Sequence, residues 1–187
     1  CLLGVTKFCA RREAGAADRQ RFKQRAALFG ADAKDGRELA VLLQGRAALA
    51  LPASDEQGRV RATVSYPGLP RVGQWIDWTV ASGTRRFAGR GQWIGDEGIS
   101  VVSDIDDTIK HTQVRQQREM LLNTFAREFT AVPGMAAWFD RIARAQSGVA
   151  FHYLSGSPLQ LMPPLGAFLR GTGFPDGSVH LRALSFN

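Results

Sequence analysis

The chain has 187 residues, of which 44% are hydrophobic and 22% charged, so it holds one domain or two small ones. This composition is typical of a globular protein and excludes a disordered chain or a fibrous repeat. No stretch approaches the roughly 18 consecutive apolar residues that a membrane-spanning helix needs, so we expect no transmembrane segment.

The positive charge is concentrated in the first half of the chain. The formal net charge is +7, and residues 1–99 carry 16 Lys and Arg against 10 Asp and Glu, with much of the excess in residues 11–25. Such a basic segment is either a solvated helix face or a surface that attracts anionic lipid head groups or phosphorylated ligands. Phe22 and Phe29 are too few aromatics for stacking against bases, so we expect no nucleic-acid partner.

Residues 1–30 form a basic leading segment, in which a helix is predicted over Ala14–Phe29 because Phe22, Ala26 and Phe29 recur at helical spacing. From residue 31 to residue 98, short apolar stretches alternate with turn-forming clusters and predict a small antiparallel β unit. The stretches are Leu39–Leu43, Ala47–Leu51, Val60–Val64, Trp75–Val80 and Gly91–Ile94. This unit contains no recognisable catalytic motif.

Residues 99–187 show another pattern, in which apolar strands alternate with amphipathic helices. Strands are predicted over Ile99–Ser103, Val149–Leu154 and Ser178–Leu184, and helices over Pro133–Ala145 and Leu159–Leu169. Alternating strands and helices form a parallel sheet, which binds its ligands at the carboxyl ends of the strands. The predicted fold class is therefore α/β: a parallel sheet preceded by a small antiparallel β unit and an N-terminal helix.

Three carboxylates follow the first of these strands directly, in the string Asp104-Ile105-Asp106-Asp107-Thr108. Like charges at this spacing repel one another, so the arrangement is costly unless a cation or a raised pKa relieves it. In an extended chain Asp104 and Asp106 lie on the same side. One of them can then hold a hard cation and attack, while the other moves a proton.

Acidic strings also occur in calcium-binding loops and at capped turns. An EF-hand loop is excluded here, because Ile109 and Arg115 stand where that loop needs Gly and Glu. An acidic strand end at which Asp107 and Thr108 cap a turn stays open as the alternative to a catalytic role.

A strand followed by Asp-x-Asp-x-Thr resembles the first motif of the haloacid dehalogenase (HAD) superfamily of phosphatases. The longer string over residues 103–110 resembles the App1 family of Mg²⁺-dependent phosphatidate phosphatases. Further stretches that resemble this family follow in order, at residues 123–125, 132–135, 151–158, 160–161, 173–175 and 178–182. The resemblance covers about residues 98–184 and implies that residues 99–187 hold a partial HAD-like (Rossmannoid) sheet.

The resemblance also implies roles for individual residues. Asp104 would be the nucleophile that forms an aspartyl-phosphate, Asp106 the general acid and base, and both would ligate Mg²⁺. Thr108 would orient the loop. Ser155, at the end of the second parallel strand, would bind the phosphate together with the backbone N–H of Gly156.

Lys110 follows the acidic loop, where it could contact the substrate; the alternative is a solvated charge. The resemblance further implies a third motif with a Lys and a fourth, acidic motif after the third strand. Neither is found before Asn187. We therefore expect a fragment, truncated at its C-terminus, that binds Mg²⁺ weakly and turns over slowly or not at all.

The predicted function is Mg²⁺-dependent hydrolysis of a lipid phosphate monoester, phosphatidate to diacylglycerol, at an anionic membrane surface that the basic segment helps to approach. Two alternatives stay open. The same chemistry could act on a soluble phosphomonoester, or the chain could be a non-catalytic module that binds lipid or another polyanion.

Overall fold

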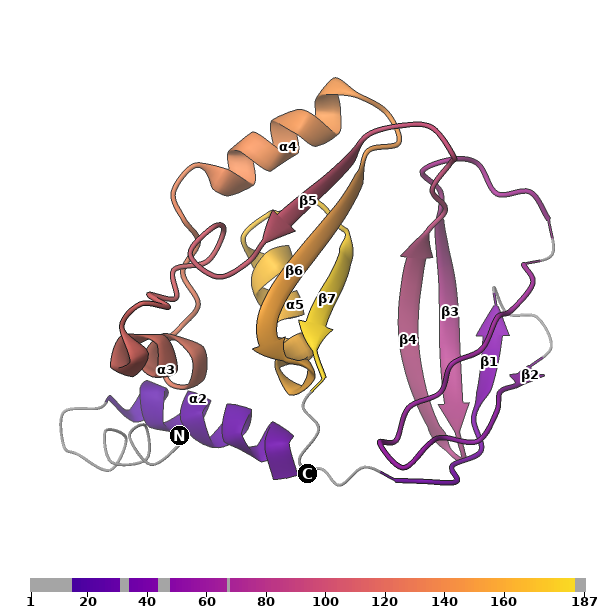
Figure 1. Ribbon diagram of the computed structural model, residues 1–187, viewed down its shortest axis with the longest axis horizontal. Coiled ribbons are helices and arrows are strands. Elements are labelled where there is room, and N and C mark those ends of the chain that lie inside the picture. The colour runs from indigo at the N-terminus through magenta and orange to yellow at the C-terminus, as the bar shows by residue number, and fades with distance from the viewer. Residues whose placement is uncertain (1–14, 31–33, 44–47, 67, 184–187) are drawn as a thin grey trace. The chain divides into compact units, whose positions relative to one another are not determined.

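The structure is a computed structural model that describes residues 15–30, 34–43, 48–66 and 68–183 (Figure 1). The chain divides into two compact units. One unit comprises residues 1–31 and 100–186, and the other comprises residues 32–99.

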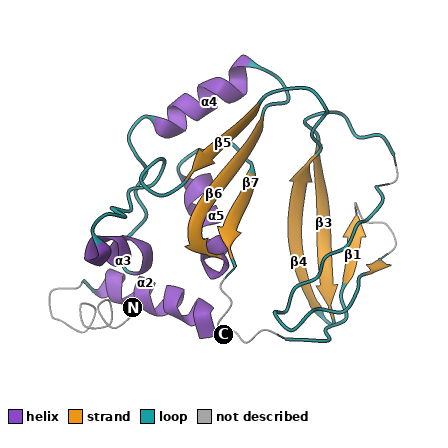
Figure 2. Cartoon of the chain, in the orientation of Figure 1, coloured by secondary structure: helices purple, strands orange, loops and turns teal. Residues whose placement is uncertain are grey.

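The first unit is built on a parallel sheet with the strand order β5-β6-β7 (Figure 2). Its strands are β5 (Ser100–Asp104), β6 (Ala150–Pro158) and β7 (Ser178–Arg182). The predicted parallel sheet is thus confirmed. Strand β6 runs on past Leu154, where the sequence predicted its end, and its pairing with β7 shifts register in this added stretch.

The helices of this unit are α2 (Ala16–Ala27), α3 (Gln117–Phe125), α4 (Met135–Ala145) and α5 (Met162–Gly171), with short 3₁₀ turns at Leu28–Gly30 and Leu159–Leu161. Helix α5 begins later than predicted, and Pro163 and Pro164 occupy its first turn. Proline is tolerated there because the first N–H groups of a helix have no intrahelical partner. The sequence did not predict α3.

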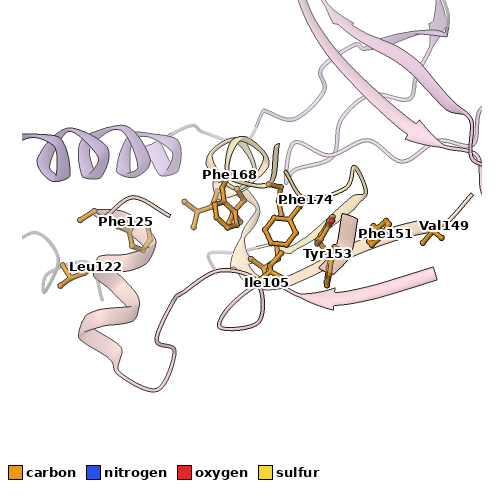
Figure 3. Close-up of a cluster of buried hydrophobic side chains, with 14 residues drawn as sticks. Ile105, Leu122, Phe125, Val149, Phe151, Tyr153, Phe168 and Phe174 are labelled. Carbon is orange, nitrogen blue, oxygen red and sulfur yellow. The ribbon is translucent and has the colours of Figure 1, made fainter. Parts of the chain in front are cut away.

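An aromatic core joins the sheet to α4 and α5. Figure 3 shows part of this cluster of buried side chains. The ring of Phe139 on α4 lies 5.8 Å from that of Phe151 on β6 and 5.7 Å from that of Phe174. Ile105, the residue between the first two acids of the acidic string, is fully buried in the same core. This burial anchors the acidic string to the sheet and keeps the carboxylates on either side of Ile105 out of the core.

Helix α2 packs on this unit through Arg25, which is buried although it belongs to the basic segment. Its Nη1 donates to the carbonyl oxygens of Thr124 and Arg127 at 3.0 and 2.8 Å. The guanidinium lies 3.8 Å from the centroid of the Phe129 ring. Burial lowers the pKa of Arg25 to about 10, so the group stays charged at neutral pH. Arg25 therefore stabilises the fold and is not part of a solvated basic face.

The second unit is an antiparallel sheet with the strand order β2-β1-β3-β4, as the sequence predicted. Its strands are β1 (Ala40–Leu43), β2 (Leu49–Ala50), β3 (Trp75–Ser82) and β4 (Arg85–Gln92). The stretch Val60–Val64 does not form a strand, and β4 starts well before the apolar stretch expected at Gly91–Ile94. Within the part of the chain described, no helix is long and apolar enough to cross a membrane.

Candidate functional site

The acidic string continues strand β5 and then turns back sharply. The N–H of Ile105 donates to the carbonyl of Leu154 at 2.9 Å, which extends the pairing of β5 with β6. The N–H groups of Ile109 and Lys110 both donate back to the carbonyl of Ile105, at 3.1 and 2.9 Å. Because Ile105 and Ile109 are both fully buried, this tight turn has a fixed position at the carboxyl end of the sheet.

The Asp106 carboxylate has polar partners on both oxygens. Oδ1 accepts from Thr112 Oγ1 at 2.6 Å and lies 3.0 Å from Lys110 Nζ. Oδ2 accepts from Ser155 Oγ at 2.5 Å and from Ser157 Oγ at 3.4 Å. Burial alone would raise the pKa of Asp106, but Lys110 and the hydroxyl donors outweigh burial and lower that pKa below its usual value. Asp106 is therefore a carboxylate at neutral pH.

Asp107 stabilises the following loop. Its carboxylate accepts from the backbone N–H groups of Thr112, Gln113 and Val114 at 2.8, 2.6 and 2.8 Å. Its backbone is left-handed, with φ 62°, a conformation that Asp tolerates better than most residues. Slight burial would raise the pKa of Asp107, but these three N–H donors lower it. The repulsion expected among three neighbouring carboxylates is thus relieved largely within the chain.

Asp104 is the most open of the three acids. It is exposed, and its Oδ2 lies 3.3 Å from Thr108 Oγ1, close enough for a weak hydrogen bond. Among the described residues, no Lys, Arg or His forms an ion pair with it. Asp104 thus remains available to an ion or a ligand, and Thr108 lies where it can orient the Asp104 side chain.

Lys110 is buried, with only 1% of its surface exposed. Its ammonium contacts Asp106 and Thr112 and lies 4.9 Å from the Phe129 ring centroid. Burial lowers the pKa of Lys110, and the Asp106 charge opposes that effect. The structure therefore places Lys110 behind Asp106, as a buried partner and not as a solvated charge.

A pocket of about 510 Å³ opens beside these groups, a volume within the range of small-molecule sites. Its lining consists of Asp104, Asp106, Thr112, Val114, Met120, Leu121, Thr124, Phe125, Gly156, Ser157 and Pro158. Of the residues predicted from the sequence, the pocket brings together Asp104, Asp106 and Gly156. Thr108, Lys110 and Ser155 are not in its lining; the Ser155 hydroxyl is bonded to Asp106 and can reach a phosphate only by releasing that bond.

Sequence reasoning missed the pocket residues contributed by α3 and, among the hydroxyl groups that bond to Asp106, Thr112 and Ser157. Ser157 could have been found, because it alternates with Ser155 along a strand and so lies on the same side. Thr112 carries no such signal. It reaches Asp106 only because the turn reverses the chain, and no spacing rule for strands or helices describes that turn.

The sequence of this region matches that of known proteins. Residues 99–187 match the family model described as the catalytic domain of phosphatidate phosphatase APP1. This part of the chain belongs to the APP1 catalytic-domain family. Every residue that lines the pocket lies inside the range matched to the APP1 family.

Two curated relatives are similar to the chain. "Phosphatidate phosphatase APP1" of Saccharomyces cerevisiae is 34% identical over 98 residues, which cover 51% of this chain and 16% of that protein. An uncharacterized protein of Schizosaccharomyces pombe is 37% identical over 90 residues, which cover 46% of this chain and 14% of that protein. The chain thus spans about a sixth of the length of these relatives.

Proposed function

We propose that this chain carries the catalytic site of a Mg²⁺-dependent phosphatase that hydrolyses a lipid phosphate monoester, phosphatidate to diacylglycerol. The observation that carries the proposal is one pocket, at the carboxyl end of a parallel strand, lined by the open carboxylate of Asp104 and the hydrogen-bonded carboxylate of Asp106. Membership of the APP1 family supports it, since the Saccharomyces cerevisiae relative is named a phosphatidate phosphatase. The proposal includes a HAD-like arrangement of the parallel sheet.

Asp104 is the proposed nucleophile. A carboxylate oxygen of Asp104 attacks phosphorus and forms an aspartyl-phosphate, while the bond from phosphorus to the alcohol oxygen breaks. Asp106 gives its proton to the leaving alkoxide. In the second step water attacks phosphorus and passes a proton to Asp106. The bond between phosphorus and the Asp104 oxygen breaks, which releases inorganic phosphate and restores the Asp104 carboxylate.

Asp106 must gain a proton before it can give one, because its polar partners keep it ionised at rest. A phosphate dianion that enters the pocket adds negative charge beside Asp106, which favours the protonated carboxyl. Lys110 pairs with one oxygen of the Asp106 carboxylate, and Ser155 on β6 donates a hydrogen bond to the other. The side chain therefore stays aimed at the pocket in either protonation state.

The residues present fit Mg²⁺. The pocket lining includes two carboxylates and no Lys, Arg or His, so a phosphate dianion without a counterion would be repelled. Asp104 and Asp106 would hold the ion, which when bound neutralises the phosphoryl oxygens. Within the described ranges, no three His, Cys, Asp or Glu side chains form a complete metal site. An ion that shares its positions with phosphate and water, as Mg²⁺ does, suits that donor set.

Asp104→Asn in the full-length protein tests this function, with Asp140→Asn as the matched control. Asp140 lies on α4 and is not in the pocket lining. Its carboxylate forms an ion pair with Arg144, with 2.8 Å between Oδ2 and Nε. Phosphate release is measured with phosphatidate and with glycerol 3-phosphate, each with and without Mg²⁺. We expect Mg²⁺-dependent hydrolysis of phosphatidate that falls by at least about 10³-fold in Asp104→Asn and is unchanged in Asp140→Asn.

The other outcomes decide between the alternatives. Preference for glycerol 3-phosphate would assign the chemistry to a soluble phosphomonoester. Hydrolysis that survives in Asp104→Asn would refute the proposed nucleophile. Binding of phosphatidate without any hydrolysis would leave a non-catalytic polyanion-binding module.

An anionic membrane surface is the proposed place of action. On the described part of the basic segment, Arg19 and Lys23 are exposed, whereas Arg25 is buried. Each Lys or Arg near an anionic surface contributes about 1 kcal/mol, so we expect weak, salt-sensitive binding. Co-sedimentation with phosphatidylserine vesicles should exceed that with neutral vesicles and fall as salt rises; equal binding to both would contradict the proposal.

A further inference from the structure

The pocket has two chemically different parts. The acidic turn and the end of β6 supply its carboxylates and most of its hydroxyls, whereas α3 supplies mainly apolar side chains together with the Thr124 hydroxyl. The apolar residues are Val114, Met120, Leu121, Phe125 and Pro158. A site for phosphate alone needs no apolar wall, so this second part serves something other than phosphate binding.

Helix α3 supplies most of the apolar wall and is apolar on two sides. Leu122 and Phe125 are buried in the core of the unit. Met120 does not belong to that core. Leu121 packs against the core but is itself only half-buried. Both nevertheless line the pocket. The second apolar side of α3 is thus only partly explained by packing within the chain, which is typical of a ligand-binding surface.

Val114 shows the same feature at the entrance to α3. It is 47% exposed, and its backbone N–H donates to Asp107 at 2.8 Å. Asp107 belongs to the same tight turn as Asp106. The turn therefore fixes an apolar side chain and the carboxylates at one pocket, so that one ligand can contact both.

We propose that the apolar wall of Val114, Met120 and Leu121 binds the hydrocarbon next to the ester oxygen of the substrate and determines specificity. The inference rests on the proposed function and adds to it the residues that select the alcohol. Phosphate lies against the polar part, and the hydrocarbon lies along α3. Apolar contact of this kind removes hydrocarbon surface from water and so lowers KM for a lipid phosphate relative to a small polar phosphate.

The size of the pocket limits how much of a lipid it encloses. A volume of about 510 Å³ suits a ligand of drug-like size, which is a phosphate with a short stretch of hydrocarbon and not two long acyl chains. The distal parts of the chains would lie outside the pocket. We therefore expect KM to fall as acyl chains lengthen from very short ones and then to reach a plateau.

The test uses the double variant Val114→Ser/Met120→Ser in the full-length protein. Val72→Ser is the matched control, since Val72 is also exposed, at 58%, and belongs to the other unit. KM and kcat are measured with dioctanoyl phosphatidate and with glycerol 3-phosphate. We expect the double variant to raise KM for the lipid about 10-fold, with a much smaller effect on kcat/KM for glycerol 3-phosphate, which lacks the hydrocarbon that contacts the wall. Equal loss for both substrates, or no change for the lipid, would overturn the inference.

A binding measurement separates this inference from the proposed function. Equilibrium binding of octylphosphonate, which has no ester bond to hydrolyse, is measured with Mg²⁺ in the wild-type protein. We expect Val114→Ser/Met120→Ser to raise the Kd about 10-fold and Val72→Ser to leave it unchanged. Absent octylphosphonate binding, or an unchanged Kd in the double variant, would refute the apolar subsite, whereas absent hydrolysis by the wild type would refute only the proposed function.

Discussion

Asp106 shows how donors from the protein itself keep a partly buried carboxylate in place. Both of its oxygens have donors within 3.0 Å, namely Lys110 and Thr112 on Oδ1 and Ser155 on Oδ2. A buried ion pair is not by itself evidence of high stability, because desolvation of the charges opposes their attraction. Removal of one partner is nevertheless costly, since the other charge then stays buried alone.

Lys110→Met tests that balance. The substitution keeps the length of the side chain and removes the ammonium, and we expect the free energy of unfolding to fall by about 3 kcal/mol. Asp106→Asn/Lys110→Met should recover much of the loss, because neither charge remains. Chemical denaturation of the wild type, both single variants and the double variant measures the coupling. If the loss of unfolding free energy in the double variant equalled the sum of the losses in the two single variants, Asp106 and Lys110 would not be coupled, which would contradict a stabilising ion pair.

At the level of single residues, the sequence predicts which side chains lie together when they belong to one regular strand, but not when a turn brings them together. Strand alternation suffices to place Asp104 and Asp106 beside one pocket, because the residues lie on a regular strand and its extension. The same reasoning does not find the partners of Lys110 or of Asp107. Both depend on a turn that reverses the chain. In this turn Asp107 and Gln113 have left-handed φ values, which the identity of these residues does not predict.

Helix α2 is attached to its unit by the buried Arg25, by Phe22, which packs against the core, and by the ion pair of Arg21 with Glu128. Arg25→Met should remove two hydrogen bonds to carbonyl oxygens and the contact with Phe129, and lower the free energy of unfolding by about 2 kcal/mol. Lys23→Met removes the same charge from an exposed position of the same helix, and should change stability by less than about 0.5 kcal/mol. Thermal denaturation of the two variants provides the comparison. Equal effects would show that charge, and not the buried contacts, is what matters.

The start of strand β7 lies unusually close to β6. A Cβ added to Gly177 would lie 2.4 Å from the Phe151 carbonyl oxygen, so the backbones must separate to accept it. We expect Gly177→Ala to destabilise the protein by about 1–3 kcal/mol. Gly171→Ala is the control, because a Cβ there meets nothing within 4 Å. Its melting temperature should be unchanged or slightly raised, and a neutral Gly177→Ala would contradict the close approach.

Elements with a single apolar pattern could be predicted from the sequence, and those with mixed patterns could not. Helix α4 (Met135–Ala145) is close to the helix predicted over Pro133–Ala145, because Met135, Trp138, Phe139 and Ile142 recur at helical spacing. Helix α3 was missed because its apolar residues lie on two sides, one toward the core and one toward the pocket. Strand β4 was predicted only at its end, because the sequence RRFAGRGQ contains three Arg and two Gly and shows no apolar alternation.

The two units of the molecule differ in how much core they contain. The first unit has a large cluster of buried aliphatic and aromatic side chains, whereas Val41 is the one buried hydrophobic residue in the described part of residues 32–99. Amides protected by a large core open only with global unfolding. We expect hydrogen exchange in β3 and β4 to be at least about tenfold faster than in β5 and β6. Equal protection in the two sheets would contradict this difference.

For the whole molecule, the sequence predicted a parallel α/β sheet, an antiparallel β unit and membership of the phosphatase family, because each rests on regular patterns or on contiguous motifs. The pocket could not be predicted. It is formed where α3, the acidic turn and the extended end of β6 meet, and that meeting depends on tertiary packing.

The proposed function depends most on a covalent role for Asp104. The direct measurement is to incubate the full-length protein with phosphatidate, labelled in its phosphate, and Mg²⁺, quench it in acid, and locate the bound phosphate by peptide mass spectrometry. A covalent role predicts phosphate on Asp104 of the wild type and none in Asp104→Asn. Phosphate on Ser155 or Ser157, or hydrolysis with no labelled protein under any quench, would contradict it.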